Sequence, residues 1–228
     1  MLTTDKAFRA PFNSPLGIRH FCDAKPPGIP FVMAVNALPP TRWLNTCSTT
    51  TGTLFTALAK QADQIGIQIV GLIAEAQVPA CERAHELGIP VTVIPFLEDR
   101  VKWDQNLATE LSRLKPSLIV CAGFMKILGP VVLRFHQGKI INTHPALLPN
   151  FPGAHAVRDA LAAGVTETGT TIHFVDKGVD TGEVIAQVRV KVEPGDTQDS
   201  LHERIKQAER ELLVATVGDI ALGKVTLK

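Results

Sequence analysis

The feature that most constrains the fold is an alternation of short apolar runs with helical patterns. Each run is rich in β-branched residues and has the length of a buried strand, whereas the segments between them repeat apolar residues at helical spacings. Alternation of this kind gives a parallel sheet covered by helices on both faces. The predicted strands are residues 67–73, 90–94, 117–122 and 139–142. The predicted helices are 79–87 and 103–114, and a brief turn or helix is expected at 130–135.

The pattern changes in the C-terminal part of the chain. Residues 170–175 and 184–192 are predicted strands joined by a glycine-rich loop at 176–182. A long amphipathic helix should follow, with Asp196 or Thr197 as its N-cap. Its apolar face consists of Leu201, Ile205, Ala208, Leu212 and Ala215. We therefore expect an α/β protein with a doubly wound, mostly parallel twisted sheet of Rossmann type and a long C-terminal helix.

The N-terminal segment differs from the rest. Residues 1–40 contain seven prolines and show no sustained period, which predicts an irregular extension with a short strand at 31–35. Residues 41–228 are then predicted to form one catalytic domain, and the total of 228 residues suits that division.

Composition excludes several classes of function. The formal net charge is +1, which gives no basic surface for nucleic acid. The four cysteines are scattered, so neither a zinc site nor a disulfide framework is expected. No apolar run approaches the ~20 residues that span a bilayer, and the first residues do not resemble a signal peptide. We expect a cytoplasmic monomer or homodimer that acts on small molecules and uses no metal, membrane or nucleic acid.

One candidate catalytic segment is Asn142-Thr143-His144-Pro145. Asn142 falls at the end of a predicted parallel strand, where ligands gather in open α/β sheets. Asn142 and His144 point to the same side of an extended chain. An amide donor and an imidazole facing one spot suit a carbonyl oxygen that becomes an oxyanion. The alternative is a histidine whose polar atoms are satisfied by backbone in a proline-rich turn.

A second candidate is Asp180, in the glycine-flanked loop 176–182. Glycines let such a loop approach a site closely. A carboxylate beside His144 would favour the protonated imidazole and raise its pKa. The alternative is an ordinary hairpin loop in which Asp and Gly serve the turn geometry.

Taken together, the segments resemble the folate-dependent formyltransferase family, and within it the branch that formylates glycinamide ribonucleotide in purine synthesis. The resemblance covers residues 119–217. It rests on five strings in the family's order, namely AGFMKIL at 122–128, INTHPALLP at 141–149, FPGAH at 151–155, GTTIHFV at 169–175 and DTG at 180–182.

The resemblance implies a role for each of these segments. Asn142 and His144 would bind the formyl oxygen, and Asp180 would orient and polarise His144. Glu209 would contact the acceptor amine, although periodicity alone would make it a solvated helix flank. The co-substrate would be 10-formyltetrahydrofolate, and a cis peptide bond is expected between Leu148 and Pro149. The residues expected around the folate are Phe124, Met125, Lys126, Ile127, Leu128, Asp176, Lys177, Gly178 and Val179.

The acceptor loop departs from the family's pattern. The family has Ser-Gly-x-Gly-x-Asn between its first strand and a helix, where backbone N–H groups hold the substrate phosphate. Here residues 48–54 contain one glycine, and Thr53 replaces the Asn. The preceding strand, residues 42–47, would be poorly suited to burial because it carries Arg42 and Asn45. The residues expected to bind the acceptor are Thr50, Thr51, Gly52, Thr53 and Glu209.

The function expected from these observations is formyl transfer to the amine of glycinamide ribonucleotide, by direct attack through a tetrahedral oxyanion intermediate. Two alternatives stay open: a formyltransferase acting on another amine, such as an amino sugar nucleotide, and a folate-binding protein with a degenerate phosphate loop and little catalysis. A methionyl-tRNA formyltransferase is less favoured because no basic RNA-binding domain follows the last helix. A formyltetrahydrofolate hydrolase is less favoured because residues 1–40 do not resemble its regulatory domain.

Overall fold

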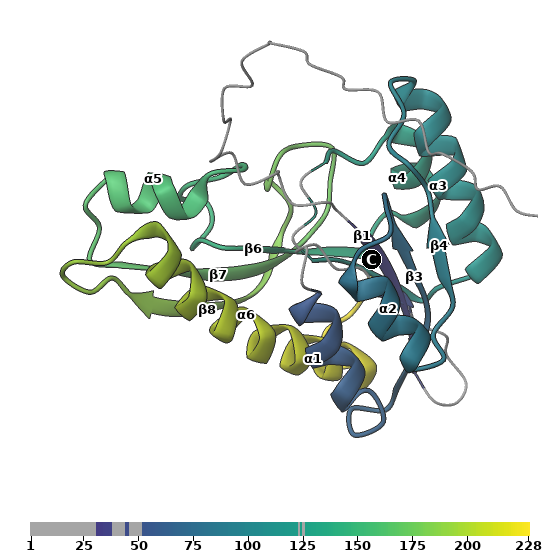
Figure 1. Cartoon of the computed structure of the whole chain (residues 1–228), viewed down its shortest axis with the longest axis horizontal. Helices are drawn as coiled ribbons and strands as arrows, with labels where there is room; N and C mark the ends of the chain where they lie inside the picture. The colour runs from purple at the N-terminus through teal and green to yellow at the C-terminus, as the bar shows by residue number, and fades with distance from the viewer. Residues whose placement is uncertain (1–30, 38–43, 46–51, 123, 125) are drawn as a thin grey trace, which may run out of the picture.

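The computed structural model describes residues 31–37, 44–45, 52–122, 124 and 126–228. Over these residues it forms one eight-stranded sheet with helices on both faces (Figure 1). The strands are β1 (Phe31–Ala37), β2 (Leu44–Asn45), β3 (Ile67–Ala74), β4 (Val91–Val93), β5 (Leu118–Ala122), β6 (Ile140–His144), β7 (Glu167–Phe174) and β8 (Val184–Lys191). The helices are α1 (Thr53–Gln61), α2 (Pro79–Glu86), α3 (Arg100–Leu114), α4 (Pro130–His136), α5 (Ala156–Ala162) and α6 (Gln198–Ala221).

The order of strands in the sheet is β4-β3-β1-β5-β6-β7-β8, with β2 paired to β1. Neighbours β3 and β4 are parallel, as are β5 and β6. Strand β1 is antiparallel to β2, β3 and β5, and β7 is antiparallel to β6 and β8. All strands except β1 and β7 therefore run in one direction. The predicted α/β class and the mostly parallel strand direction are confirmed, although antiparallel pairings outnumber parallel ones.

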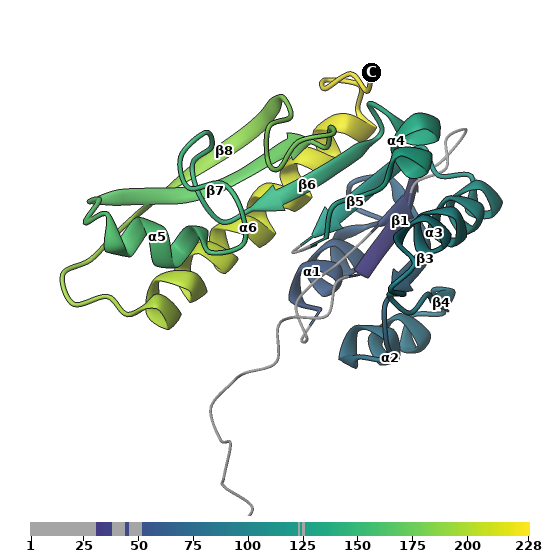
Figure 2. The same cartoon turned by 90° about the horizontal axis from the view of Figure 1, so that it is seen from above.

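The continuous apolar runs reflect burial on both faces of the sheet. In β5, Leu118, Val120 and Ala122 belong to one core cluster, while Ile119 and Cys121 belong to the other. Helices α1, α2 and α6 pack on the first face, and α3 and α4 on the second (Figure 2). Because side chains alternate along a strand, a central strand with two covered faces needs apolar residues at every position.

The long C-terminal helix is confirmed as α6, and its N-cap is Thr197, whose side chain accepts from the backbone N–H of Ser200. Asp196, the other candidate, instead accepts a hydrogen bond from Arg204. The short strand expected at 31–35 is confirmed as β1, which lies inside the sheet. The division of the chain at residue 40 stays a prediction. Helix α5 was not predicted.

Two further expectations concern local structure. The peptide bond between Leu148 and Pro149 is cis, as expected. Of the strand expected at 42–47, the structure describes Leu44–Asn45, which form β2. Over the described ranges, no helix combines the length and apolarity that crossing a bilayer requires.

Candidate active site

The candidate catalytic residues meet at a cavity of about 910 Å³ at the carboxyl ends of β5 and β6. Asn142 and His144 reach it from β6, and Asp180 reaches it from the loop between β7 and β8. Residues that are far apart in the sequence therefore share one site, as expected for a ligand cleft in an open α/β sheet.

The carboxylate of Asp180 contacts His144, Gly153 and His173 at the centre of the site. Its Oδ2 lies 3.3 Å from Nδ1 of His144 and accepts a hydrogen bond from the backbone N–H of Gly153 at 2.8 Å. Its Oδ1 lies 3.5 Å from Nε2 of His173. Asp180 has a φ of 54°, a left-handed conformation that Asp tolerates better than most residues. This backbone turn directs the carboxylate back towards β6 and β7.

The contacts of His144 define its tautomer. Its Nε2 lies 2.8 Å from the carbonyl oxygen of Phe151, which can only accept, so Nε2 carries a proton. In the neutral ring, Nδ1 is then the nitrogen that can take a proton, and it faces Asp180. One nitrogen thus contacts the backbone, as the alternative expected, and the other faces the Asp180 carboxylate. Binding of the formyl oxygen by His144 stays a prediction.

The expected pKa of His144 was wrong in direction. Burial lowers the pKa of this imidazole below its ordinary value; Asp180 and the Phe151 carbonyl oppose the shift without reversing it. The ring is 4% exposed, so the loss of hydration of the charged form outweighs one nearby carboxylate. Burial alone would raise the pKa of the Asp180 carboxyl group. The contacts with His173, Gly153 and His144 lower this pKa by more, so it lies below its usual range.

Asn142 presents an open polar atom to the site. Its amide nitrogen lies 3.4 Å from Nε2 of His173, and its Oδ1 is buried without a hydrogen-bond partner among the described residues. The amide nitrogen has two N–H bonds, so Asn142 can donate one to His173 and offer the other to a ligand. A buried polar atom without a partner costs free energy, and a bound ligand can relieve that cost.

His173 is a site residue that sequence reasoning gave no role. It is 2% exposed and lies on β7 directly opposite Asn142 on β6. Its Nδ1 donates to the carbonyl oxygen of Phe174 at 2.8 Å, which leaves Nε2 for Asn142 and Asp180. The signal in the sequence was the matched string GTTIHFV, but only the pairing of β6 with β7 places His173 next to Asn142.

The segments expected around the folate border the same cavity. Phe124, Lys126, Ile127 and Leu128 line it after β5. Asp176, Gly178 and Val179 line it from the loop that carries Asp180. Lys177 is exposed and is not among the lining residues. Met125 lies outside the described residues.

The residues expected to bind the acceptor lie on or before α1 and on α6. Thr53, the first residue of α1, lines the cavity opposite Glu209, Lys206 and Arg210 of α6. Gly52 precedes α1 with a φ of 62°, and a Cβ there would lie 2.6 Å from Cβ of Ala80, so a glycine is required. Thr50 and Thr51 lie outside the described residues.

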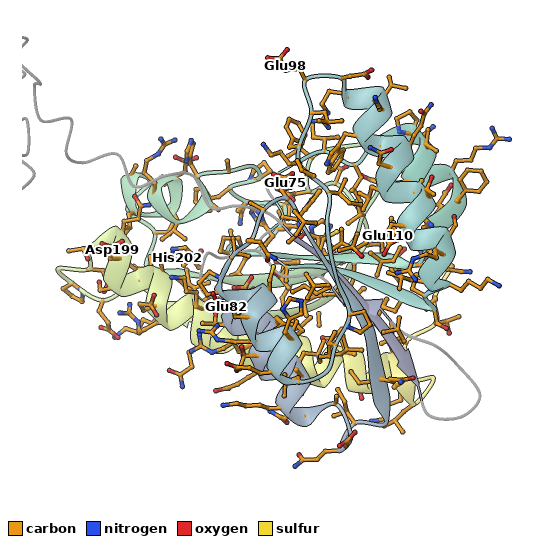
Figure 3. The ribbon with its side chains drawn as sticks, turned by 45° about the vertical axis from the view of Figure 1, so that its right-hand side comes forward. Glu75, Glu82, Glu98, Glu110, Asp199 and His202 are labelled. Atoms are coloured by element: carbon orange, nitrogen blue, oxygen red, sulfur yellow. The ribbon has the colours of Figure 1, made fainter. Side chains whose placement is uncertain are left out.

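Glu209 is not the solvated helix flank that periodicity alone suggested. It is 6% exposed, and burial raises the pKa of its carboxyl group, an effect that the neighbouring Thr143 side chain opposes. Asp199 and His202 extend the lining along the N-terminal part of α6, as Figure 3 shows. Within the described ranges, no three His, Cys, Asp or Glu side chains are grouped so as to hold a metal ion.

Comparison with known proteins gives one consistent family. Residues 45–217 match the family model described as formyl transferase. The chain is 44% identical over 180 residues to a phosphoribosylglycinamide formyltransferase of Mycobacterium tuberculosis (strain CDC 1551 / Oshkosh), covering 78% of this chain and 84% of the relative. It is 41% identical over 156 residues to the human trifunctional purine biosynthetic protein adenosine-3, covering 67% of this chain and 15% of that protein.

Solved structures agree with the sequence relatives. Glycinamide ribonucleotide transformylase 1 from Symbiobacterium toebii superposes with a TM-score of 0.75 at 32% identity, covering 78% of this chain and 86% of that one. Phosphoribosylglycinamide formyltransferase from Streptococcus pneumoniae TIGR4 superposes with a TM-score of 0.70 at 37% identity, covering 75% and 93%.

Proposed function

The chain belongs to the formyl transferase family, and on that basis we propose that it transfers a formyl group from 10-formyltetrahydrofolate to the primary amine of glycinamide ribonucleotide. The observation that carries this proposal is that the amide of Asn142 lines the cavity beside the pair formed by His144 and Asp180. This arrangement suits a small carbonyl group that gains negative charge during reaction.

The reaction needs no covalent enzyme intermediate, because an unprotonated amine is itself a good nucleophile. The amine nitrogen attacks the formyl carbon, and the formyl oxygen takes the negative charge of the tetrahedral intermediate. The amide N–H of Asn142 then donates a hydrogen bond to this oxyanion. Collapse of the intermediate breaks the bond between the formyl carbon and the folate nitrogen.

One proton must pass from the attacking nitrogen to the departing folate nitrogen. Burial favours the neutral form of His144, because it lowers the pKa of the imidazole. A developing oxyanion nearby makes protonation of the ring more favourable, and Asp180 stabilises the imidazolium at Nδ1. We therefore propose that the proton moves by way of the His144–Asp180 pair as the charge on the formyl oxygen appears, rather than residing on His144 beforehand.

The two ends of the cavity divide the substrates. The groups that Phe124, residues 126–128, Asp176, Gly178 and Val179 present to the cavity suit the pteridine of the folate. The start of α1, with Lys206 and Arg210 across the cavity, suits the phosphate of the ribonucleotide. Glu209 lines the same cavity beside the Thr143 side chain, and in this proposal it accepts a hydrogen bond from the acceptor amine.

The experiment that tests the function is a single-turnover assay with 10-formyltetrahydrofolate and glycinamide ribonucleotide. We expect tetrahydrofolate and the formylated ribonucleotide in equal amounts. Formylation of an amino sugar nucleotide but not of the ribonucleotide would overturn the acceptor assignment. Stabilisation by folate in a thermal-shift titration without turnover of either amine would indicate a binding protein instead.

We further propose that the enzyme works in the cytoplasm on small-molecule substrates as a monomer or homodimer. The small formal net charge of +1 and the small-molecule cavity support this assignment. Light scattering coupled to size-exclusion chromatography would separate the two assembly states.

A further inference from the structure

Asp104 is a buried carboxylate that the reaction described above does not use. It lies on α3, is 2% exposed, and accepts hydrogen bonds from two backbone N–H groups at the start of α4. Gly129 donates to Oδ1 at 2.9 Å, and Val131 donates to Oδ2 at 2.8 Å. The first N–H groups of a helix have no partner inside it, and the N-cap residue Gly129 has no side chain to supply one. Asp104 therefore caps α4 from a neighbouring helix.

Gly129 is suited to this contact by its missing side chain. Its φ of −80° and ψ of 170° are available to any residue, so the backbone conformation does not require glycine. A Cβ at this position would collide with the Cγ and both oxygens of Asp104. The glycine instead leaves the space that the carboxylate occupies.

The same part of α3 directly contacts the donor segment, by which we mean the described residues Phe124 and 126–128. Arg100 donates a hydrogen bond from Nη2 to the carbonyl oxygen of Ile127 at 2.6 Å. The ring of Trp103 stacks on that of Phe124, with centroids 6.3 Å apart and planes inclined by 18°. Residues 100–104 thus hold the donor segment near both ends, and Asp104 fixes the point where it enters α4.

We propose that Asp104 is a positioning residue for the folate donor. It acts by fixing the start of α4, and through it Leu128 and the backbone of the donor segment that lines the cavity. Hydrogen bonds to a charged acceptor are stronger than neutral ones, and their loss leaves two backbone donors without partners. Displacement of a substrate-positioning segment by about 1 Å has large effects on a reaction. The inference rests on the donor segment proposed above.

The test is Asp104→Asn, which keeps the shape of the side chain but replaces one acceptor oxygen with an NH₂ group. We expect the KM for 10-formyltetrahydrofolate to rise about tenfold, the effect of losing one charged hydrogen bond. The KM for glycinamide ribonucleotide and the kcat at saturating donor should stay unchanged. Amide hydrogen exchange should become faster at Gly129 and Val131, which reports the cap independently of any substrate.

Leu111→Ala is the matched control on the same helix. Leu111 lies about two helical turns beyond Asp104 on α3 and is fully buried, so its truncation lowers stability by leaving a cavity. It should leave both KM values unchanged. An equal rise in the donor KM for Leu111→Ala would reduce the role of Asp104 to general stability and overturn the proposal. If Asp104→Asn does not fold, Gly129→Ala displaces the carboxylate from the opposite side and is read in the same way.

Phe124→Ala separates failure of this inference from failure of the donor assignment. If Phe124→Ala raises the donor KM while Asp104→Asn speeds exchange at Gly129 without changing that KM, the positioning role of Asp104 is wrong and the donor segment stands. If neither variant changes the donor KM, folate binds elsewhere and both assignments are wrong.

Discussion

Asn142 and His173 face each other across β6 and β7, and the amide nitrogen of Asn142 lies 3.4 Å from Nε2 of His173. The same Nε2 lies 3.5 Å from Oδ1 of Asp180. Asn142, His173, Asp180 and His144 therefore form one connected polar group rather than separate contacts. Groups connected in this way behave as a unit when one member is removed.

The first prediction follows from that connection. Asn142→Ala should lower kcat by about 10²–10³, the usual effect of removing one oxyanion donor. Asp180→Asn should be at least as damaging, because it removes the charge that stabilises protonated His144. The double variant should be little worse than the poorer single one, since the residues act together. Rapid-quench measurement of kcat at saturating folate checks this.

The control for this series is Asn150→Ala, an exposed asparagine that does not line the cavity. It should retain the kcat of the unmodified enzyme. Near-normal activity of Asp180→Asn would contradict the proposed mechanism while leaving the fold and family intact.

The second prediction concerns stability and pH. The folded-state pKa of His144 lies below the ordinary value of 6.5 because burial disfavours the charged ring. The unfolded chain therefore binds more protons, and this contribution to stability is present above pH 6.5 and is lost as pH falls through the folded-state pKa. Wild-type protein should lose more free energy of unfolding over this range than His144→Asn does, as measured by urea denaturation at several pH values.

His136 complicates that comparison, because burial and the nearby Lys139 also lower its pKa. His136→Asn should remove a further part of the pH dependence of the free energy of unfolding. The exposed His85 supplies the control, and His85→Asn should leave the profile as it is. A His144→Asn profile identical to that of the wild type would contradict the lowered pKa.

The third prediction concerns the acceptor end. If the start of α1 binds the phosphate, Thr53→Val should raise the KM for glycinamide ribonucleotide and leave the KM for the folate unchanged. Thr56→Val is the matched control, because Thr56 lies on the same helix, does not line the cavity and donates to the carbonyl oxygen of Gly52 at 3.0 Å. Steady-state kinetics with each substrate varied in turn distinguishes the two variants. Equal acceptor KM values for both would show that Thr53 does not serve the phosphate.

Much of the fold was predictable because its determinants are local. The run at 117–122 is apolar at every position, as a strand covered on both faces must be, and the structure places it at β5. The position of β1 was not predictable in this way. Its place between β3 and β5 depends on how strands that are distant in the sequence are arranged in the sheet. Residues 31–37 carry no local signal for strand order or direction.

The sequence predicted those parts of the site whose residues lie close together in the chain. Asn142 and His144 are separated by one residue of an extended strand, so their shared side follows from the alternation of side chains. The role of His173 requires the register of β6 against β7. The pKa of His144 requires the balance between burial and one carboxylate, and the sequence contains the carboxylate but not the burial.

The last prediction concerns Glu209, which is buried at the acceptor end of the cavity. Burial raises the pKa of its carboxyl group, so the folded chain binds this proton more tightly than the unfolded chain. This contribution to stability is present below the ordinary value of 4.5 and is lost as pH rises through the folded-state pKa. Near neutral pH, ionisation of Glu209 therefore lowers the free energy of unfolding. Active sites retain such groups at the expense of stability, which agrees with the proposed acceptor role.

Glu209→Gln keeps the shape of the side chain and removes the charge. We expect the Tm at pH 7.5 to rise and the KM for glycinamide ribonucleotide to increase, with the folate KM unchanged. Glu211→Gln, an exposed carboxylate two residues along the same helix, should change neither. Differential scanning calorimetry at pH 4.5 and 7.5 adds a sharper condition. The gain in Tm should shrink at the lower pH, because there both the wild-type carboxyl and the glutamine are neutral. A variant less stable than the wild type at pH 7.5 would mean that the Glu209 carboxylate stabilises the fold, and the acceptor role would then lose its physical support.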